Sequence, residues 1–385
     1  MDAFYASVEL LRYPQLKGMP VVIGGARRTA DAAMQSTDAA TAPERIPLEA
    51  FPRLRGYTGR GVITTATYAA RAFGIGSAMG LMKAAKLCPD AILLPVDFDA
   101  YRHYSRAFKD IITDIAPLVQ SVGIDEVYID FTDVAGGQRE GGRVLARLVQ
   151  KSIFDATGLT CSVGVAPNKL LAKMASEFNK PNGISVVRAE DLQAVIWPLP
   201  CRKINGVGPK ADAKLQGHGI GTIGELAACQ LVWLVQHFGK SQGAWLHDAA
   251  WGRDNRPLAT HTEPVTISRE TTFERDLHPV RDRDALGQIF TQLCAQVAAD
   301  LQRKGYAGRT VGVKLRDDRF TTTTRNHSVA LAINDAQAIR NAAGMALKRA
   351  PLTRPLRLLG VRVDGLLKSG LVTIQDCSGL QGELF

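Results

Sequence analysis

Between residues 97 and 187, stretches with helical periodicity alternate with short runs of β-forming residues. The helical stretches are YRHYSRAFKDIITDIAPLV and GGRVLARLVQKSIFDAT, and the β-rich runs are SVGIDEVYIDF, LTCSVGVA and GISVV. Helices and strands bury their apolar faces by stacking in layers, so this alternation predicts one mixed layer of both. We therefore expect an α+β central domain over this part of the chain.

The chain has 385 residues, of which 46% are hydrophobic and 22% are charged, so it can bury sizeable cores in two to four domains. No apolar run approaches the roughly 18 to 20 residues of a membrane helix, because charges such as Arg71, Lys83 and Lys169 interrupt every candidate. The start MDAFYASVELLRYPQ has no basic segment followed by an apolar one. We expect a cytoplasmic protein that does not bind membranes.

The cysteines form no CxxC pair and no Cys/His cluster with zinc-binding spacing. The six are Cys88, Cys161, Cys201, Cys229, Cys294 and Cys377. In a large chain without a signal peptide, an even number of cysteines does not indicate disulfide bonds. We therefore expect no disulfide scaffold and, because the zinc-binding spacings are lacking, no structural zinc.

The charge balance favours a polyanionic partner. Lys and Arg number 47 against 37 Asp and Glu, which gives a formal net charge of +10. Residues 265–385 hold 18 Lys and Arg against 12 Asp and Glu, so about a third of the chain carries +6 of that charge. Nucleic acid and a membrane surface both fit this excess, and charge alone does not choose between them.

Outside the central domain the pattern changes in several places. PVVIGG, at 20–25, predicts a buried strand that ends in a glycine turn. Residues 26–59 are rich in Ala, Thr, Arg and Pro without sustained periodicity, and we predict a long, mobile surface insertion there. Helical segments punctuated by glycine occupy 188–253, and WGRDNRPLATHTEP, at 251–264, is typical of an interdomain linker.

The last module is predicted to be a small α+β domain with one basic sheet face. Its strands are TVGVKLR and VRVDGLL, and its helix covers 285–304. TVGVKLR and RFTTTTR would present alternating basic and hydroxyl side chains to a nucleic-acid backbone. Lys314, Arg316 and Arg325 are the candidates for phosphate contacts, which position nucleic acid without specifying its sequence.

SVGIDEVYIDF places Asp125 and Glu126 side by side between β-forming residues. Adjacent strand residues point to opposite faces, so the two converge on one site only if the chain bends, which Gly123 makes easier. Two converging carboxylates suit Mg²⁺, which prefers oxygen ligands and leaves room for substrate phosphates. The alternative is an ordinary hairpin turn with two solvated acids.

TATYAAR supplies Thr65, Tyr68 and Arg71, and NKPNG supplies Lys180. The two cations suit a polyphosphate, and the two hydroxyl groups would donate further hydrogen bonds to it. The alternative is a solvated basic face.

INGVGPKADAKLQGHGIGT, at 204–222, matches a helix-hairpin-helix. Its glycines, Gly206 and Gly208, let backbone N–H groups at a helix start approach a DNA phosphate, with Lys210 beside them. It is not a dinucleotide fingerprint, because the third glycine and a βαβ unit are lacking. The alternative is a glycine-rich turn between helices.

The chain ends in QGELF, in which Gln381, Leu384 and Phe385 form a short linear peptide. Such a peptide suits the groove of a partner protein, and the alternative is a frayed tail.

Taken together, these motifs resemble Y-family DNA polymerases, most closely the bacterial DNA polymerase IV type. The matching segments occur in that family's order and cover nearly the whole chain: MDAFYASVE, GVITTATYAARAFGIGSAM, SVGIDEVYIDFTD, SVGVAPNKLLAKMASEFNKPNG and the helix-hairpin-helix. The resemblance implies an α+β multidomain, right-hand polymerase with a ferredoxin-like palm, small fingers, a helical helix-hairpin-helix thumb and an α+β little-finger domain.

The resemblance also implies domain bounds. The palm would take 1–9 and 97–187, and the fingers 10–96 with the insertion at about 26–59. The remaining parts would be the thumb at 188–253, the linker at 254–264, the little finger at 265–373 and the tail at 374–385.

The implied reaction is template-directed, error-prone translesion DNA synthesis without proofreading, with dNTPs, primer–template DNA and two Mg²⁺ ions. Asp125 would bind metal and Glu126 would complete the site beside the primer end. Phe4 and Tyr5 would lie under the incoming nucleotide, with Tyr5 as the steric gate against a ribose 2′-hydroxyl. The triphosphate would be held by the four polyphosphate candidates, Thr65, Tyr68, Arg71 and Lys180. The resemblance further implies a nucleoid-associated monomer whose tail binds a sliding clamp.

Two departures from the family pattern stand out. The family opens with Asp-Met-Asp, and this chain begins at the middle Met, so that Met1 offers only a backbone carbonyl and Asp2 is the second acid. The two explanations are a start placed at an internal Met and a truncated form, and we favour the first; we expect severely impaired catalysis for the chain as written. The insertion is the other departure, and deleting residues 30–58 is expected to leave activity largely intact.

Two other functions stay open at this stage. One is a non-catalytic relative that binds DNA and the clamp, which the incomplete metal ligation favours and the complete nucleotide-binding set opposes. The other is a helix-hairpin-helix nuclease, which does not explain the steric-gate segment.

Overall fold

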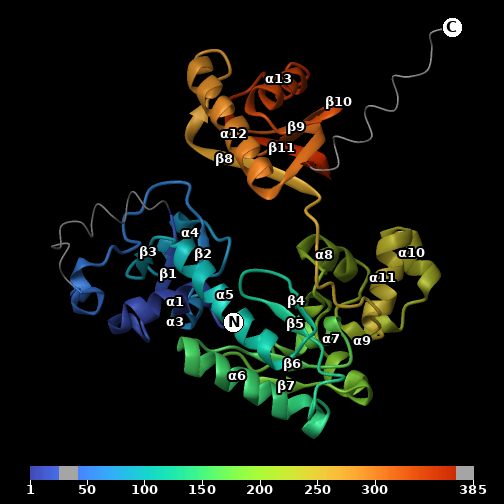
Figure 1. The fold of residues 1–385 in the computed structure, drawn as a ribbon. Helices are drawn as coiled ribbons and strands as arrows, with labels where there is room; N and C mark the ends of the chain where they lie inside the picture. The colour runs from blue at the N-terminus through green and yellow to red at the C-terminus, as the bar shows by residue number, and fades with distance from the viewer. Residues whose placement is uncertain (26–41, 370–385) are drawn as a thin grey trace. The chain divides into compact units, whose positions relative to one another are not determined.

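The chain divides into two compact units, Met1–His261 and Thr262–Phe385, whose residues contact mainly other residues of the same unit. The computed structural model describes residues 1–25 and 42–369, and Figure 1 shows the order of their helices and strands. The boundary lies at His261, inside the segment for which a linker is predicted. Each unit is described by itself below.

The predicted palm consists of helices that cover two small sheets. The helices are α5 (Phe98–Ile115), α6 (Arg143–Thr157) and α7 (Lys169–Ala175). The strands are β4 (Val119–Ser121), β5 (Val127–Ile129), β6 (Val163–Val165) and β7 (Ile184–Val186). The antiparallel pair β4–β5 and the parallel pair β6–β7 are separate two-stranded sheets in the described part of the chain, not one continuous sheet.

Apolar side chains of α5 and α6 form the floor beneath these strands. The apolar positions on each helix repeat every three or four residues, so one stripe is buried. The buried cluster is Phe108, Ile112, Val149, Ile153 and Cys161. This floor fixes where the hairpin between β4 and β5 stands.

The first two residues lie between the two sheets. The Met1 amino group donates to the Asp125 carbonyl oxygen at 2.8 Å, and the Asp2 N–H donates to the Thr160 carbonyl oxygen at 3.0 Å. Asp2 is 2% exposed, and its carboxylate accepts from the Ser162 hydroxyl and from the Asn182 N–H. The chain thus enters the space between the sheets at one end.

The predicted fingers and the segment before them surround a three-stranded sheet of order β2-β1-β3. Its strands are β1 (Val21–Gly24), β2 (Ile63–Ala66) and β3 (Ile92–Leu94), and the helices beside it are α1 (Phe4–Arg12), α3 (Tyr68–Arg71) and α4 (Leu81–Leu87). β1 is buried along its whole length, as expected for PVVIGG. Gly24 allows a close strand approach, because an added Cβ would lie 2.5 Å from the Val62 carbonyl oxygen.

The predicted mobile insertion is wrong for its second half. Residues 42–59 contain two 3₁₀ turns, η2 (Pro43–Arg45) and η3 (Leu48–Ala50), and their backbone is tied to the rest of the unit. Phe51 and Leu54 are buried in two different apolar clusters. The sequence did not predict that Phe51 and Leu54 are buried, because two apolar residues in an Ala-, Pro- and Arg-rich segment do not produce a periodic pattern. Residues 26–41 lie outside the described residues.

The predicted thumb is a series of helices: η5 (Ala189–Asp191), η6 (Leu192–Ile196), η7 (Cys201–Lys203), α8 (Pro209–Gly217), α9 (Ile223–Ala227), α10 (Leu231–Phe238) and α11 (Lys240–Ala250). Thr222 and Glu225 form a reciprocal capping box at the start of α9. At Gly206 φ is 113°, and an added Cβ would lie 2.8 Å from the Trp245 ring. Only glycine fits this turn.

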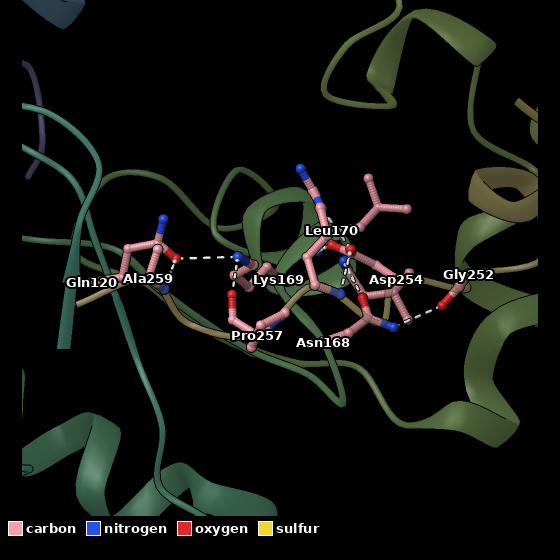
Figure 2. Close-up of polar contacts among 10 residues, drawn as sticks. Gln120, Asn168, Lys169, Leu170, Gly252, Asp254, Pro257 and Ala259 are labelled. Atoms are coloured by element: carbon pink, nitrogen blue, oxygen red, sulfur yellow. Dashed lines mark hydrogen bonds and ion pairs between the residues drawn. The ribbon is translucent and has the colours of Figure 1, made fainter. Parts of the chain in front are cut away.

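Residues 252–259 are bonded to the palm rather than free (Figure 2). Asn168 donates to the Gly252 carbonyl oxygen, and Lys169 donates to the Pro257 carbonyl oxygen, both at 2.7 Å. The Ala259 N–H donates to Gln120 of β4. The predicted linker at 254–264 is therefore wrong in its first part, which belongs to the first unit.

The second unit is a four-stranded antiparallel sheet of order β10-β9-β11-β8, with two helices on one face. The strands are β8 (Thr266–Leu277), β9 (Tyr306–Asp317), β10 (Thr322–Ile333) and β11 (Leu356–Lys368), and the helices are α12 (Arg283–Lys304) and α13 (Ala336–Leu347). Val311, Val313 and Leu315 of β9 alternate into the core with the helices. The intervening residues face the other side and are mostly polar.

Replacing Leu54 by Ala tests whether residues 42–59 are an integral part of the first unit. Leu54 is fully buried, so the change should lower the free energy of unfolding by about 2 to 5 kcal/mol. Glu49→Ala, at an exposed position of the same segment, should change it by less than about 0.5 kcal/mol. Chemical denaturation measures the free energy of unfolding of both variants. Equal, small changes would support the prediction that residues 42–59 are a mobile insertion.

Candidate active site

The hairpin between β4 and β5 carries the two predicted carboxylates. The N–H groups of Val122 and Gly123 both donate to the Glu126 carbonyl oxygen, at 3.0 and 3.3 Å. Lys109 of α5 donates to the Gly123 carbonyl oxygen at 2.6 Å. The turn is therefore fixed from within the hairpin and from the helix below it.

The Asp125 carboxylate lies on the side of Tyr5 and Lys109. Burial, and then the negative charge of Asp125, raise the pKa of the Tyr5 hydroxyl above its usual range. Burial lowers the pKa of Lys109, and the Asp125 charge opposes that change. Asp125 is therefore near a phenol and an ammonium group.

The Glu126 carboxylate lies on the side of α7, in the turn just before β5 begins at Val127. Its Oε1 atom forms an ion pair with the Lys173 ammonium group. Burial lowers the pKa of Lys173, but the hydrogen bond and charge of Glu126 outweigh it and raise that pKa overall. We did not predict Lys173 from the sequence, although it lies in the matched segment LLAKMASEFNKPNG.

Alternating charges continue from Lys173 to the predicted phosphate ligand. The Oε1 atom of Glu177 lies 3.7 Å from the Nζ atom of Lys173 and 2.7 Å from the Nζ atom of Lys180. Burial opposes ionisation of Glu177, but Lys180 and Lys173 together lower its pKa. Glu177 and Lys180 lie in the turn and the loop that follow α7, so these pairs depend on the path of the chain after Ala175 and not on one helical face.

Tyr68 and Arg71 of α3 face this row of charges. Burial, and then the nearby Asp2 carboxylate, raise the pKa of Tyr68 to about 12, with smaller effects from Arg71 and Glu177. The Arg71 guanidinium lies 4.8 Å from the Tyr68 ring centroid and donates through Nε to the Ala66 carbonyl oxygen. Among the residues that the structure describes, the buried Tyr68 hydroxyl has no hydrogen-bond partner of acceptable geometry, although the Asp2 carboxylate lies close to it.

The structure thus brings groups from the predicted fingers and palm together. Tyr68 and Arg71 come from α3, whereas Asp2, Glu177 and Lys180 come from the palm. Thr65 is buried in β2, opposite Ile23 of β1. An unsatisfied buried hydroxyl beside cations is the environment that a phosphate oxygen would complete.

Tyr5 and Phe4 have different surroundings. The Tyr5 ring is half-buried, 4.4 Å from the Tyr101 ring centroid and edge-on to Phe98 at 6.1 Å. The Phe4 ring is 3% exposed and packs edge-on against Phe108. The Phe4 side chain is therefore a core group, and a contact of Phe4 with a nucleotide stays a prediction that only its backbone could meet.

A cavity of about 910 Å³ runs between β5 and β6 and contains Met1, Asp125, Glu126, Lys173 and Lys180 in its lining. Phe108, Ile112 and Val149 line its floor. In the described part of the chain, β5 pairs only with β4 and β6 only with β7. The edges of both strands that border the cavity thus lack a strand partner.

Asp125 and Glu126 have the oxygen donors that Mg²⁺ prefers, with the Met1 carbonyl in the same cavity. Across residues 1–25 and 42–369, however, no three His, Cys, Asp or Glu side chains gather in a metal-binding group. Both oxygens of Asp2 are already hydrogen-bonded to the palm. Asp125 and Glu126 are therefore the candidate ligands for a divalent cation, and among the described residues no third side chain of a metal-binding type joins them.

The helix-hairpin-helix glycines stand before α8. Gly208 precedes Pro209 at the start of α8, and an added Cβ at Gly208 would meet no atom within 4 Å. The first-turn N–H groups of the helix have no internal partner, and Lys210 is exposed beside them. This geometry leaves the turn open to an anion.

The polar sheet face of the second unit carries Lys314 and Arg316, whereas Arg325 lies on the opposite side. Arg325 is exposed and is paired with Val313, and its Nε donates to the Arg349 carbonyl oxygen. A one-residue change in register inverts a strand's faces, so the three do not share one face, and a phosphate contact of Arg325 stays a prediction. Arg362, which we had not predicted, lies on the polar face beside Gly312.

Further along the polar face, Lys314 is paired with Glu270 and Arg316 donates to Thr322. Gln381, Leu384 and Phe385 lie outside the described residues. None of the described helices is long and apolar enough to cross a bilayer.

Comparisons with known proteins agree with this arrangement. The impB/mucB/samB family model matches residues 1–177, its C-terminal domain matches 264–375, and the helix-hairpin-helix motif of the IMS family matches 189–220. The Y-family DNA polymerase chimera Dbh-Dpo4(243-245)-Dbh has the same fold, with a TM-score of 0.78 at 24% identity over 95% of this chain and 97% of that chain. An insertion ternary complex of Dbh DNA polymerase matches with a TM-score of 0.60 at 23% identity, over 95% and 97% of the two chains.

Sequence relatives extend over the full chain. DNA polymerase IV of Alkalilimnicola ehrlichii is 37% identical over 100% of this chain and 97% of its own length. DNA polymerase IV of Caulobacter vibrioides is 38% identical over 100% of this chain and 84% of its own length. On these matches, the chain belongs to the impB/mucB/samB family, and within it to the Y-family DNA polymerases of the DNA polymerase IV type.

Proposed function

We propose that this protein is a DNA-directed DNA polymerase that performs error-prone translesion synthesis without proofreading. The observation that carries the proposal is the meeting of two hairpin carboxylates with an unsatisfied tyrosine hydroxyl and two cations. Asp125, Glu126 and Lys180 line one cavity, and Tyr68 and Arg71 approach from the fingers. This set suits transfer of a nucleotide from a triphosphate to a primer hydroxyl.

Each side chain has a defined part in the proposed reaction. Tyr68, Thr65, Arg71 and Lys180 hold and orient the triphosphate, and Arg71 is kept in place by its bond to the Ala66 carbonyl. Asp125 and Glu126 hold divalent metal, with Glu126 beside the primer end. Bound Mg²⁺ would neutralise phosphate charge and favour ionisation of the primer hydroxyl.

Tyr5 is the proposed steric gate. Its ring is braced by Tyr101, whose hydroxyl donates to Glu9 at 2.6 Å, and by the edge of Phe98. Because these contacts restrict the Tyr5 ring near Asp125, the ring would occupy the space that a ribose 2′-hydroxyl needs. Phe4 supports this ring from the core through its contacts with Tyr5 and Phe108.

A pair of Mg²⁺ ions requires another carboxylate, and the cavity between β5 and β6 indicates where it would come from. Both bordering edges have free pairing positions, and Met1 already donates to Asp125 at one end. An extended segment before Met1 would pair with these edges above the apolar floor. We propose that such a segment completes the palm and places an Asp beside Asp125 and Glu126.

The remaining proposed partners follow from the other domains. The thumb turn at Gly206, Gly208 and Lys210 would bind phosphates of duplex DNA, as would Lys314 and Arg316 of the little finger. Gln381, Leu384 and Phe385 would bind the sliding clamp. We propose a nucleoid-associated cytoplasmic monomer.

A second candidate is a non-catalytic relative that occupies primer ends. The observation in its favour is the metal-ligand set, because within the described residues no third side chain of a metal-binding type joins Asp125 and Glu126, and Glu126 is already paired with Lys173. Its DNA affinity would still fall steeply as salt rises, because counterions are released from the phosphates.

Primer extension separates these two functions. The 385-residue chain would be compared with two forms lengthened by an apolar segment of roughly six residues, which ends in Asp or in Asn directly before Met1. We expect the Asp form to extend a primed template with Mg²⁺ at least about a hundredfold faster than the other two.

Two other results of that assay would contradict this expectation. Equal rates for the 385-residue chain and the Asp form would show that the segment and its Asp are not needed. If no form extends the primer while all three bind primed DNA, the non-catalytic function is correct.

Replacing Tyr5 by Ala tests the steric gate. Removal of the ring should raise ribonucleotide incorporation, relative to deoxyribonucleotide, by at least about tenfold. Tyr5→Phe keeps the ring and should keep the sugar selectivity of the parent protein. Single-nucleotide incorporation kinetics measure both variants, and unchanged selectivity in Tyr5→Ala would remove Tyr5 from this role.

A further inference from the structure

We propose that Asp254, at the exit from the thumb, is a positioning residue for the polymerase reaction and acts on Glu126 through α7. The inference rests on the proposed role of Glu126. It assigns a part in catalysis to a segment that the sequence places in a linker.

Asp254 caps a helix that begins 85 positions before it along the chain. The Leu170 N–H donates to Asp254 Oδ2 at 3.1 Å, and the Leu171 N–H donates to the side chain of Asn168 at 3.0 Å (Figure 2). The first N–H groups of a helix have no internal partner, so these two oxygens fix the first turn of α7. The negative charge of Asp254 also suits the positive end of the helix.

The position of Asp254 is itself fixed. Arg256 donates to both carboxylate oxygens, through Nε at 2.6 Å and through Nη2 at 2.7 Å. This pairing, against the effect of burial, holds the pKa of Asp254 below its usual range. A bidentate pair restricts both side chains, so the cap stays charged and in one orientation.

A parallel set of bonds ties the same end of α7 to the catalytic hairpin. Lys169 donates to Gln120 of β4 at 3.1 Å and to the Pro257 carbonyl oxygen at 2.7 Å. Gln120 Oε1 also accepts from the Ala259 N–H at 3.2 Å. Figure 2 shows Gln120, Lys169 and residues of segment 252–259 converging around these bonds.

One helical turn carries the constraint to the active site. Lys173 follows Leu170 by three residues and Lys169 by four, so it lies on the same face about 5 Å further along the axis. Its ammonium group holds one oxygen of Glu126. A shift at the start of α7 therefore moves Lys173, and with it the Glu126 carboxylate.

Small displacements of this kind affect rate more than binding. A misplacement of about 1 Å at reacting groups can cost roughly a hundredfold in rate. Three of the four proposed triphosphate ligands, Thr65, Tyr68 and Arg71, stand on β2 and α3, which the 252–259 segment does not contact through any of these bonds. Lys180 is joined to Lys173 only indirectly, through Glu177. Loss of the cap should therefore reduce kcat much more than it changes the KM for dNTP.

The test uses Asp254→Ala in the full-length form that extends primers. We expect kcat to fall about tenfold, the Mg²⁺ concentration for half-maximal rate to rise, and the KM for dNTP to change less than about twofold. Asp254→Asn keeps an acceptor oxygen for Leu170 and should recover kcat to within about threefold. Asp248→Ala, an exposed acid that contacts Arg253 and His247 rather than α7, is the matched control and should match the parent.

Hydrogen exchange gives a readout that does not depend on activity. In Asp254→Ala, the amides of Leu170, Val122 and Gly123 should exchange faster than in the Asp248→Ala control. Unchanged kcat in Asp254→Ala would overturn the proposal, as would equal losses of kcat and melting temperature in both Asp254 variants. If the parent protein incorporates no nucleotide, the proposed function fails, and unchanged exchange at Val122 and Gly123 would then reject this inference separately.

Discussion

The ion pair between Lys173 and Glu126 is the contact on which the site depends. It joins α7 to the hairpin that carries both carboxylates, across elements that share no strand pairing. Without it, Glu126 would have no cation to hold its orientation, and the row that continues through Glu177 to Lys180 would lose its first member. A partly buried network of this kind is favourable only while each charge has its partner.

The palm is held by helices more than by strand pairing. α5 and α6 supply the apolar floor, and the 252–259 segment fixes α7 from outside. The cavity between β5 and β6 keeps the carboxylates accessible to a substrate, and it is bordered by two strand edges that no strand of residues 1–25 or 42–369 pairs with. The same feature therefore explains both the openness of the site and its shortage of metal ligands.

Sequence patterns predicted the elements well where periodicity is strong. The helix from 285 to 304 and the strand PVVIGG were predicted in the right places. Contacts between distant segments were not predictable, because Lys173, Asp254 and Leu54 acquire their roles only from neighbours far along the chain. Arg325 shows a different limit, since its face depends on strand register, which the Thr-rich sequence of β10 does not specify.

The most direct test of the account is single-nucleotide incorporation by Asp125→Asn and Glu126→Gln, in the form of the protein that extends primers. Each change keeps the side chain's shape and removes its charge. We predict that each lowers kcat by at least about a hundredfold, whereas Asp133→Asn, at an exposed position after the same hairpin, leaves it unchanged. A rate within about threefold of the parent for either active-site variant would contradict the assignment of catalysis to this hairpin.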